Sequence, residues 1–211
     1  RKLKFGIVGN GSIAKKHINL IKEKFPNSQI NVLIHKNKIK SKFKLNFFYK
    51  DNFFFQIPYD YMLICNPCTR HIEYIEKCIR YKLKNIFVEK PLSNNFFQTK
   101  KFINKYPSLK KKILVGYVLL FNKILLKTLR LINKKKLGKI ISAKIICNSN
   151  FKKWRKDIKF YKTVSANKKL GGGVLNELSH ELSYAIKLFG PIKKVFAKLS
   201  NKNKKKINVE T

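Results

Sequence analysis

The chain has 211 residues, 49 of them Lys or Arg and only 10 Asp or Glu, which gives a formal net charge of +39 at pH 7. Its length excludes a peptide or a disulfide-stapled mini-domain, and it suits one large domain or one domain with part of another. A hydrophobic content of 44% excludes a disordered basic tail. Only five of the basic residues are Arg, so the charge reflects a lysine-rich composition as readily as a polyanionic partner.

The sequence contains no stretch that predicts membrane insertion or export. Its longest apolar run, residues 113–126, is interrupted by Asn122 and Lys123 and is shorter than the about 18 residues that a membrane span needs. The first residues lead directly into a strand-like run, and four scattered cysteines indicate reduced thiols. We therefore expect a cytoplasmic protein. Because the chain begins with Arg1 and ends in a strand-like run, we also expect a fragment of a longer protein.

Strand-like and helix-like runs alternate along the first half of the chain. The predicted strands are residues 3–8, 30–34, 61–65, 85–88 and 113–117. The predicted helices are residues 12–24, 69–81, 93–105 and 121–132. Short, fully apolar strands in this alternation are typical of a parallel sheet that helices cover on both faces. The pattern predicts an α/β fold with a domain boundary near residue 118.

The second half of the chain has a less regular pattern. We expect strands at residues 139–147 and 192–199, and a helix that runs from the glycines at 171–173 to Phe189. The Lys-rich segment around Trp154 predicts an irregular structure. The charge run at its end, residues 201–206, is typical of a solvated hairpin turn.

A glycine turn follows the first predicted strand and opens the first predicted helix, which is the context that a G-x-G-x-x-A motif requires. Gly9 permits the tight turn, Gly11 lets the backbone approach a pyrophosphate, and Ala14 lets helix and strand pack closely. Ser12 and Ile13 complete the cofactor-binding candidates of this turn, where the helix N-terminus attracts negative charge. The turn predicts NAD or NADP as cofactor. The alternative is a glycine turn that binds no ligand.

The end of the second predicted strand bears on the choice between NAD and NADP. NAD sites usually carry an acid there, which binds the 2′-hydroxyl of the ribose. Here the strand ends in His35 and Lys36, and no acid follows in the next residues. Basic side chains can pair with a 2′-phosphate, so the pattern favours NADP. The alternative is that these residues only reflect the lysine-rich composition.

Two more segments leave predicted parallel strands at their carboxyl ends, where open α/β sheets bind their ligands. The first contains Asn66, Pro67 and His71, and the second contains Glu89 and Lys90. We expect all five residues to line the cofactor site.

Together with the glycine turn, these segments resemble the Gfo/Idh/MocA family of sugar and cyclitol oxidoreductases. The Glu-Lys-Pro step of that family is present at residues 89–91, and the resemblance continues in order through residues 115–117, 137–140 and 171–184. The resemblance implies a dinucleotide-binding Rossmann domain with a doubly wound parallel sheet at residues 1–118. It also implies a partial substrate or oligomerisation α/β domain with an open sheet at residues 119–211. Because members of the family are longer, we expect the second domain to be incomplete.

The resemblance implies hydride transfer between NAD(P) and a hydroxyl or keto carbon of a sugar, nucleotide sugar or cyclitol. Such a reaction needs a proton acceptor beside the carbon that exchanges the hydride. By the family pattern, Lys90 and His180 are catalytic residues beside the substrate. The third catalytic position falls on Asn176 or Glu177, and we favour Glu177. The Glu-Leu-Ser-His-Glu segment there is similar to a branch of the family found in surface-polysaccharide and sugar-acid pathways.

Two positions depart from the family pattern and bear on activity. Ser183 stands where the family often has Asp, and Leu120 stands where Arg commonly follows the Gly-Tyr strand. The alternative function is therefore a non-catalytic or degenerate NAD(P)-binding protein.

Two further readings of the sequence are less consistent with its patterns. Cys65, Cys68, His71 and Cys78 could suggest a zinc or redox site, but they span a strand end and a helix rather than paired turns, so we expect no metal site. We expect the cysteines, Cys147 included, to be buried in the core.

Nucleic-acid binding has the charge and the aromatic clusters at residues 47–49 and 53–55 in its favour, but no known nucleic-acid-binding motif is present. We therefore expect a small sugar-like substrate, no specific nucleic-acid partner and no membrane partner. An open sheet in the second domain would offer an edge for a homo-oligomer.

Overall fold

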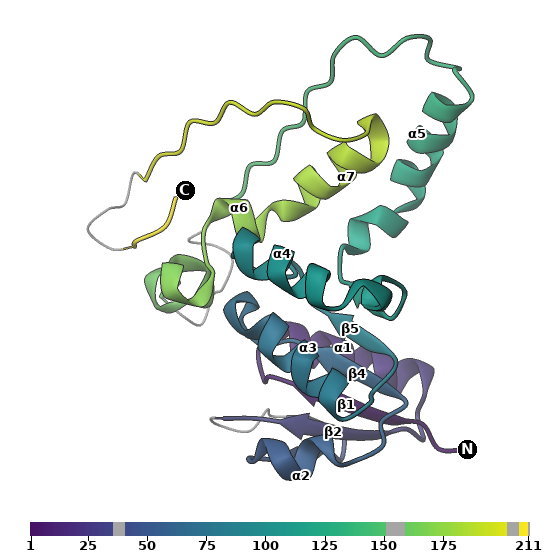
Figure 1. The fold of residues 1–211 in the computed structure, drawn as a ribbon, viewed down its shortest axis with the longest axis vertical. Helices are drawn as coiled ribbons and strands as arrows, with labels where there is room; N and C mark the ends of the chain where they lie inside the picture. Colours follow the sequence, from purple (N-terminus) through teal and green to yellow (C-terminus); the bar gives the residue numbers. More distant parts are fainter. Residues whose placement is uncertain (36–40, 151–158, 202–206, 211) are drawn as a thin grey trace. The chain divides into compact units, whose positions relative to one another are not determined.

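The computed structural model describes residues 1–35, 41–150, 159–201 and 207–210 of the chain. These residues form two compact units, Arg1–Gly116 and Tyr117–Thr211, which we call unit 1 and unit 2 (Figure 1). The division lies beside the boundary expected at residue 118. All strands of the described residues belong to unit 1.

Unit 1 is built on a six-stranded sheet in the order β3-β2-β1-β4-β5-β6, and every neighbouring pair runs parallel. The strands are β1 (Lys4–Val8), β2 (Gln29–Leu33), β3 (Asn46–Phe48), β4 (Tyr61–Ile64), β5 (Ile86–Val88) and β6 (Ile113–Val115). Its helices are α1 (Ser12–Lys24), α2 (Asp51–Phe55), α3 (His71–Arg80) and α4 (Phe96–Lys105). This is the doubly wound order of a Rossmann fold, in which the strand order reverses between β1 and β4.

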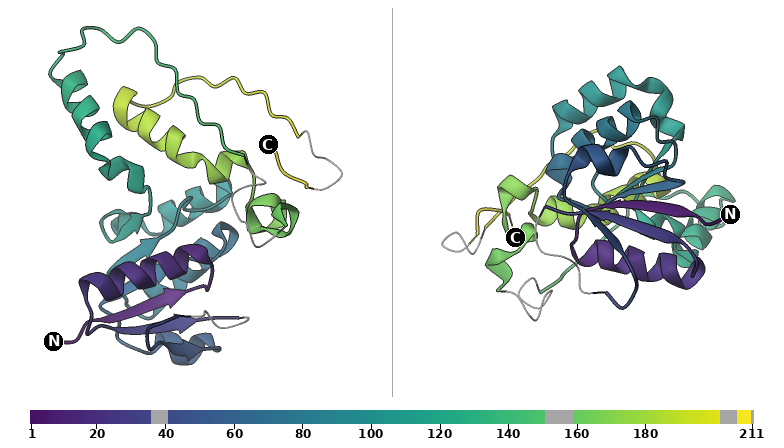
Figure 2. Two further views of the ribbon diagram at one scale, coloured as in Figure 1. Left: turned by 180° about the vertical axis from the view of Figure 1, so that it is seen from behind. Right: turned by 90° about the horizontal axis from the view of Figure 1, so that it is seen from below.

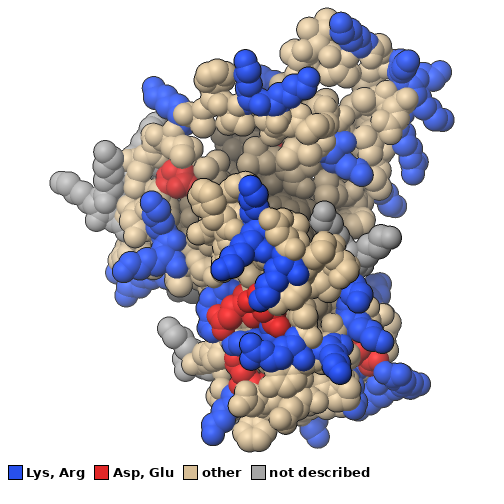
Figure 3. All heavy atoms as spheres, viewed as in Figure 1, with Lys and Arg blue, Asp and Glu red and all other residues tan. Residues whose placement is uncertain are grey.

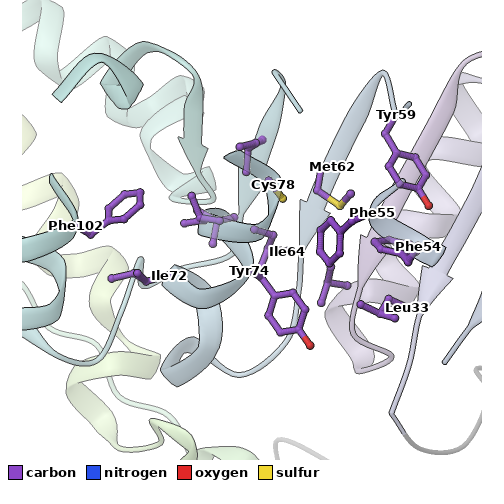
Figure 4. Close-up of a cluster of buried hydrophobic side chains, with 14 residues drawn as sticks. Leu33, Phe54, Phe55, Tyr59, Met62, Ile64, Ile72, Tyr74, Cys78 and Phe102 are labelled. Carbon is purple, nitrogen blue, oxygen red and sulfur yellow. The ribbon is translucent and has the colours of Figure 1, made fainter. Parts of the chain in front are cut away.

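Two apolar layers hold the helices against the two faces of this sheet. Helix α1 covers one face, and α2, α3 and α4 cover the other (Figure 2). Because successive side chains of a strand point to opposite faces, Ile7 packs with α1 whereas Val8 packs with α2 and α3. Figure 4 shows the second layer, where buried aromatic side chains such as Phe54, Phe55 and Tyr74 gather beside β2 and β4. The carboxyl ends of the strands are thereby held at one edge.

Sequence patterns predicted most of unit 1, with α1 placed at its observed bounds, but they missed β3 and α2. These elements have only three and five residues, which is too short to display a strand or helix period. Their structure depends on tertiary contacts: β3 pairs with β2, and Phe54 and Phe55 of α2 are almost completely buried.

Unit 2 differs more from the prediction. Its α-helices are α5 (Lys123–Asn133), α6 (Val174–Glu177) and α7 (Ser179–Phe189), so the single helix expected up to Phe189 is interrupted at Leu178. The strands expected at residues 139–147 and 192–199 do not form. A strand is stable only when it pairs, and here Ile141 and Phe196 are 91% and 96% exposed. The open sheet and its edge are thus not seen in the described part of unit 2. Trp154 and residues 202–206 lie outside the described residues.

The surface reflects the lysine-rich composition. Figure 3 shows Lys and Arg side chains spread over the visible face, with acidic side chains gathered over α3. Ion pairs join Glu73 to Arg70 and Lys77, and Glu76 to Lys105. Within the described residues, no helix combines the length and the apolar character that crossing a membrane would require.

We expect the Phe54→Ala substitution to lower the free energy of unfolding by about 3–5 kcal/mol, because Phe54 is fully buried among aromatic rings. Phe53→Ala is the matched control, since the neighbouring Phe53 side chain is 62% exposed. Urea unfolding followed by far-UV circular dichroism measures both. Equal losses in the two variants would contradict the placement of α2 against the sheet.

Candidate functional site

The glycine turn lies where the strand order reverses, at the carboxyl end of β1. Gly9 has a φ of +104°, and a Cβ atom there would lie 2.9 Å from the carbonyl oxygen of Cys65 and 3.0 Å from the amide nitrogen of Asn66. Its own N–H donates a hydrogen bond of 3.0 Å to the carbonyl oxygen of Leu33. Only glycine combines this backbone conformation with this close approach. Gly9 therefore lets the ends of β1, β2 and β4 converge.

The first turn of α1 presents backbone donors next to Gly9. Gly11 is the N-cap of α1 and provides no side-chain cap, and the first turn contains no acidic residue. A Cβ atom on Gly11 would meet nothing within 4 Å, so there is open space in front of this backbone. Ser12 is exposed, Ile13 is half-buried, and Ala14 is completely buried where helix and strand pack closely. Uncapped N–H groups at a helix start suit a phosphate group.

Asn66 supplies the clearest sign of a ligand-binding position at this edge. Both polar atoms of its side-chain amide, Nδ2 and Oδ1, are buried and have no hydrogen-bond partner among the described residues. Leaving such groups unpaired is costly, so buried amides are normally satisfied. Asn66 lies two residues after the end of β4, and Pro67 then leads into a 3₁₀ turn, Cys68–Arg70. A polar ligand at this edge would satisfy the amide.

His71 ties the segment after β4 to the segment after β5. It is 1% exposed, and its Nδ1 and Nε2 atoms each lie 2.8 Å from a backbone carbonyl oxygen, that of Pro91 and that of Asn66. A neutral imidazole can donate to only one of them, whereas the protonated ring donates to both. Burial lowers the pKa of His71 below its ordinary value of 6.5, against the opposing influence of the two carbonyls and of Glu89. His71 thus links the backbone of the two segments, and its contact with a cofactor stays a prediction.

Glu89 has protein partners for both carboxylate oxygens. Its Oε1 atom lies 2.7 Å from Nε2 of His17, and its Oε2 atom accepts a hydrogen bond of 3.3 Å from the backbone N–H of Lys90. The His17 ring also packs edge-on against Phe87. Glu89 therefore contacts the backbone of Lys90, and the cofactor contact that we expected of it stays a prediction. Sequence reasoning missed His17, whose one signal is its place one helical turn after Ala14 on α1.

The end of β2 carries His35, whose Nε2 atom lies 2.7 Å from the hydroxyl oxygen of Tyr74 on α3. Lys36, the other basic residue expected there, lies outside the described residues. The guanidinium of Arg70 lies over the ring of the same Tyr74. Sequence analysis did not single out Arg70 or Tyr74. The signal for Arg70 was its rarity, since the chain has five arginines among 49 basic residues.

Unit 2 carries the other two predicted catalytic residues. Glu177 ends α6 and His180 lies in the first turn of α7, on either side of the interruption at Leu178. The His180 ring packs edge-on against Tyr117 of the same unit, with 5.7 Å between the ring centroids. Lys90 belongs to unit 1. The catalytic roles of the three residues therefore stay predictions.

The cysteines give no support to thiolate chemistry. Burial raises the pKa of Cys65 well above its ordinary value and that of Cys78 to about 12. Among the described residues, no three His, Cys, Asp or Glu side chains are grouped to hold a metal ion. The expectation that Cys147 is buried was wrong: the strand expected to contain it does not form, and its exposed thiol shares a hydrogen bond with Glu181.

Comparison with known proteins agrees with this geometry. The sequence profile GFO_IDH_MocA, an oxidoreductase family with an NAD-binding Rossmann fold, matches residues 3–117. No curated protein sequence gives a significant match. Similar solved structures include apo scyllo-inositol dehydrogenase from Lactobacillus casei, with a TM-score of 0.53 and 22% identity over 66% of this chain and 44% of that one.

Two further structures are similar. Myo-inositol 2-dehydrogenase from Lactobacillus plantarum has a TM-score of 0.59 and 18% identity, over 67% of this chain and 44% of that one. The WlbA dehydrogenase from Chromobacterium violaceum, solved with NADH and UDP-GlcNAcA, has a TM-score of 0.77 and 18% identity, over 100% of this chain and 61% of that one. The chain thus spans less than two thirds of the length of these proteins, and the likeness concerns the fold.

We expect low pH to reduce the stability of unit 1 because of His71. Because the folded state lowers the pKa of His71, the unfolded chain binds more protons below the ordinary value of 6.5. This contribution to stability is therefore present above pH 6.5 and is lost as the pH falls below it. We expect the urea concentration at the unfolding midpoint of the wild-type chain to be lower at pH 5.5 than at pH 7.5. For His71→Gln, the same change of pH should lower the midpoint less. Parallel pH profiles for the two proteins would contradict this role.

Proposed function

Because the chain belongs to the Gfo/Idh/MocA oxidoreductase family, whose members share an NAD-binding Rossmann fold, we propose that unit 1 binds a nicotinamide dinucleotide and that the protein is a dehydrogenase. The observation that carries the proposal is the edge formed by Gly9 and Asn66, where a backbone cradle adjoins a buried amide without a partner. The proposed substrate is a sugar, nucleotide sugar or cyclitol with a hydroxyl or keto carbon. Support for it comes from the inositol dehydrogenases and WlbA, whose fold this chain shares.

The residues of unit 1 fit the parts of a dinucleotide. The uncapped N–H groups at the start of α1 suit the pyrophosphate, and Gly11 leaves open space for it beside the backbone. The amide of Asn66 can donate and accept a hydrogen bond at the carboxyl end of β4. These groups bind and orient the cofactor, and the nearby Glu89 holds the backbone of Lys90.

The absence of an acid at the end of β2 supports NADP rather than NAD as the preferred cofactor. His35 occupies the position where NAD sites usually carry Asp or Glu, and it cannot act as a carboxylate acceptor for a ribose 2′-hydroxyl. An imidazole and nearby basic groups suit a 2′-phosphate.

A nicotinamide supplies hydride acceptance and donation at the substrate carbon, so the protein has to move only the hydroxyl proton. We assign that proton to Lys90: its neutral amine accepts the hydroxyl proton when the substrate is oxidised, and its ammonium returns a proton to the keto oxygen in the reverse reaction. His180 relays the proton, and Glu177 orients the imidazole. These three roles follow from the match of residues 89–91 and 177–181 to the family pattern.

We expect the Gly11→Asp substitution to abolish the binding of both NADH and NADPH, because a carboxylate would occupy the open space and repel the pyrophosphate. Asn19→Asp is the matched control: it adds the same charge to an exposed position of the same helix, and binding should persist. Fluorescence titration with each nucleotide, at salt high enough to screen nonspecific attraction, measures both. Loss of binding in both variants, or in neither, would contradict the assignment of the pyrophosphate to this turn.

We expect Lys90→Met to leave NADH and NADPH binding intact and to lower turnover at least about a hundredfold, which is the scale of general acid–base catalysis. Lys84→Met removes the same charge from an exposed position shortly before β5 and serves as control. Initial rates are measured by nicotinamide absorbance with a panel of cyclitols and nucleotide sugars. A chain that binds nucleotide but turns over no member of the panel would instead support the non-catalytic alternative.

A further inference from the structure

A buried tyrosine on α3 contacts two nitrogen-bearing side chains, that of His35 after β2 and that of Arg70 after β4. Tyr74 is fully buried, its ring stacks on Phe55, and its hydroxyl oxygen lies 2.7 Å from Nε2 of His35. In Figure 4 this hydroxyl points away from the apolar cluster in which the ring is embedded. The guanidinium carbon of Arg70 lies 4.9 Å from the centroid of the same ring. Tyr74 is therefore a fixed support for both His35 and Arg70.

The orientation of the Arg70 guanidinium is also fixed by a carboxylate. Its Nε and Nη2 atoms donate hydrogen bonds of 2.9 and 3.0 Å to the two carboxylate oxygens of Glu73. The hydrogen bonds from Arg70 lower the pKa of Glu73 to about 2, so the carboxylate stays charged at neutral pH. Two of the five N–H groups are used in this way, and the Arg70 side chain remains 44% exposed.

We propose that Arg70, together with His35, recognises the 2′-phosphate of NADP and is the residue that determines cofactor specificity. This inference rests on the proposed function, since the end of β2 is the place of the adenosine ribose in a dinucleotide-binding sheet. A planar guanidinium pairs with two phosphate oxygens at once, which the ammonium of a lysine cannot do. In a chain this rich in lysine, an arginine at this position supplies a geometry as well as a charge.

The surrounding charges make this recognition depend on geometry rather than on net charge. Lys77 also contacts Glu73 and reaches Asp51, so two cations and two carboxylates balance within the cluster around Tyr74. Its ammonium lies 4.4 Å from the centroid of the Tyr74 ring. Within this described cluster, a phosphate therefore gains little from net positive charge. It gains from the guanidinium edge and from the imidazole that contacts the same tyrosine.

The test compares dissociation constants for NADPH and NADH, measured by fluorescence titration of the whole chain at one fixed salt concentration. The wild-type chain should bind NADPH more tightly than NADH. Arg70→Met should weaken NADPH binding about tenfold to a hundredfold, the effect of losing a charge-assisted pair, and should leave NADH binding unchanged. Adenosine 2′,5′-bisphosphate should displace NADPH from the wild-type chain better than 5′-AMP does, and this difference should vanish in the variant.

Two companion variants keep the test decisive. Arg80→Met removes the same charge from the exposed end of α3 and should change neither constant. Arg70→Lys preserves the charge but not the paired geometry, so its NADPH affinity should fall between those of the wild type and Arg70→Met; it also serves if the methionine variant does not fold.

Three results would overturn the inference while leaving dinucleotide binding intact: a wild-type preference for NADH, equal weakening of both nucleotides in Arg70→Met, or no change in either. A folded wild-type chain that binds neither nucleotide would overturn the proposed function as well.

Discussion

The close approach of three strand ends at Gly9 is the constraint on which the site of unit 1 depends. The N–H of Gly9 bonds to the end of β2, and the space where its Cβ would lie is filled by the backbone after β4. Any side chain would push β4 away and also strain the turn. With glycine, the start of α1, His35 and Asn66 all belong to one compact edge. The arrangement is a consequence of backbone packing before any ligand is considered.

Long-range polar contacts then fix the loops that this edge leaves. His71 joins the backbone after β4 to Pro91, and the pair of His17 and Glu89 joins α1 to the backbone of Lys90. These groups are buried or nearly so, which makes each contact stronger than its surface equivalent and costly to break. Such contacts order a site before a ligand binds, which reduces the conformational entropy that is lost on binding.

Local patterns in the sequence were sufficient to predict the elements whose hydrophobic period or helix start is visible within a few neighbouring residues. The glycine turn followed by an apolar helical period placed α1 at its observed bounds. By contrast, β3 and α2 exist because a neighbouring strand and an aromatic core support them, and the strands expected in unit 2 have apolar patterns but no partner. The same limit applies to the site. The partner of His17 lies 72 residues away in the chain, so only the fold brings the two together.

In this chain the rare residues are more informative than the abundant ones. A lysine at any one position says little where 49 residues are basic, and the lysine-rich pattern after β2 is an example. The ten acids and five arginines are a different case, because each stands against that compositional bias. Glu89 sits under Lys90, and Glu73 orients Arg70. A surface with so much positive charge could pair with many more carboxylates. These two carboxylates instead bind the backbone N–H of Lys90 and the guanidinium of Arg70, close to the carboxyl ends of the strands. The lysine-rich composition therefore explains the net charge, whereas the placement of these few residues indicates a binding site whose side chains are fixed by specific contacts.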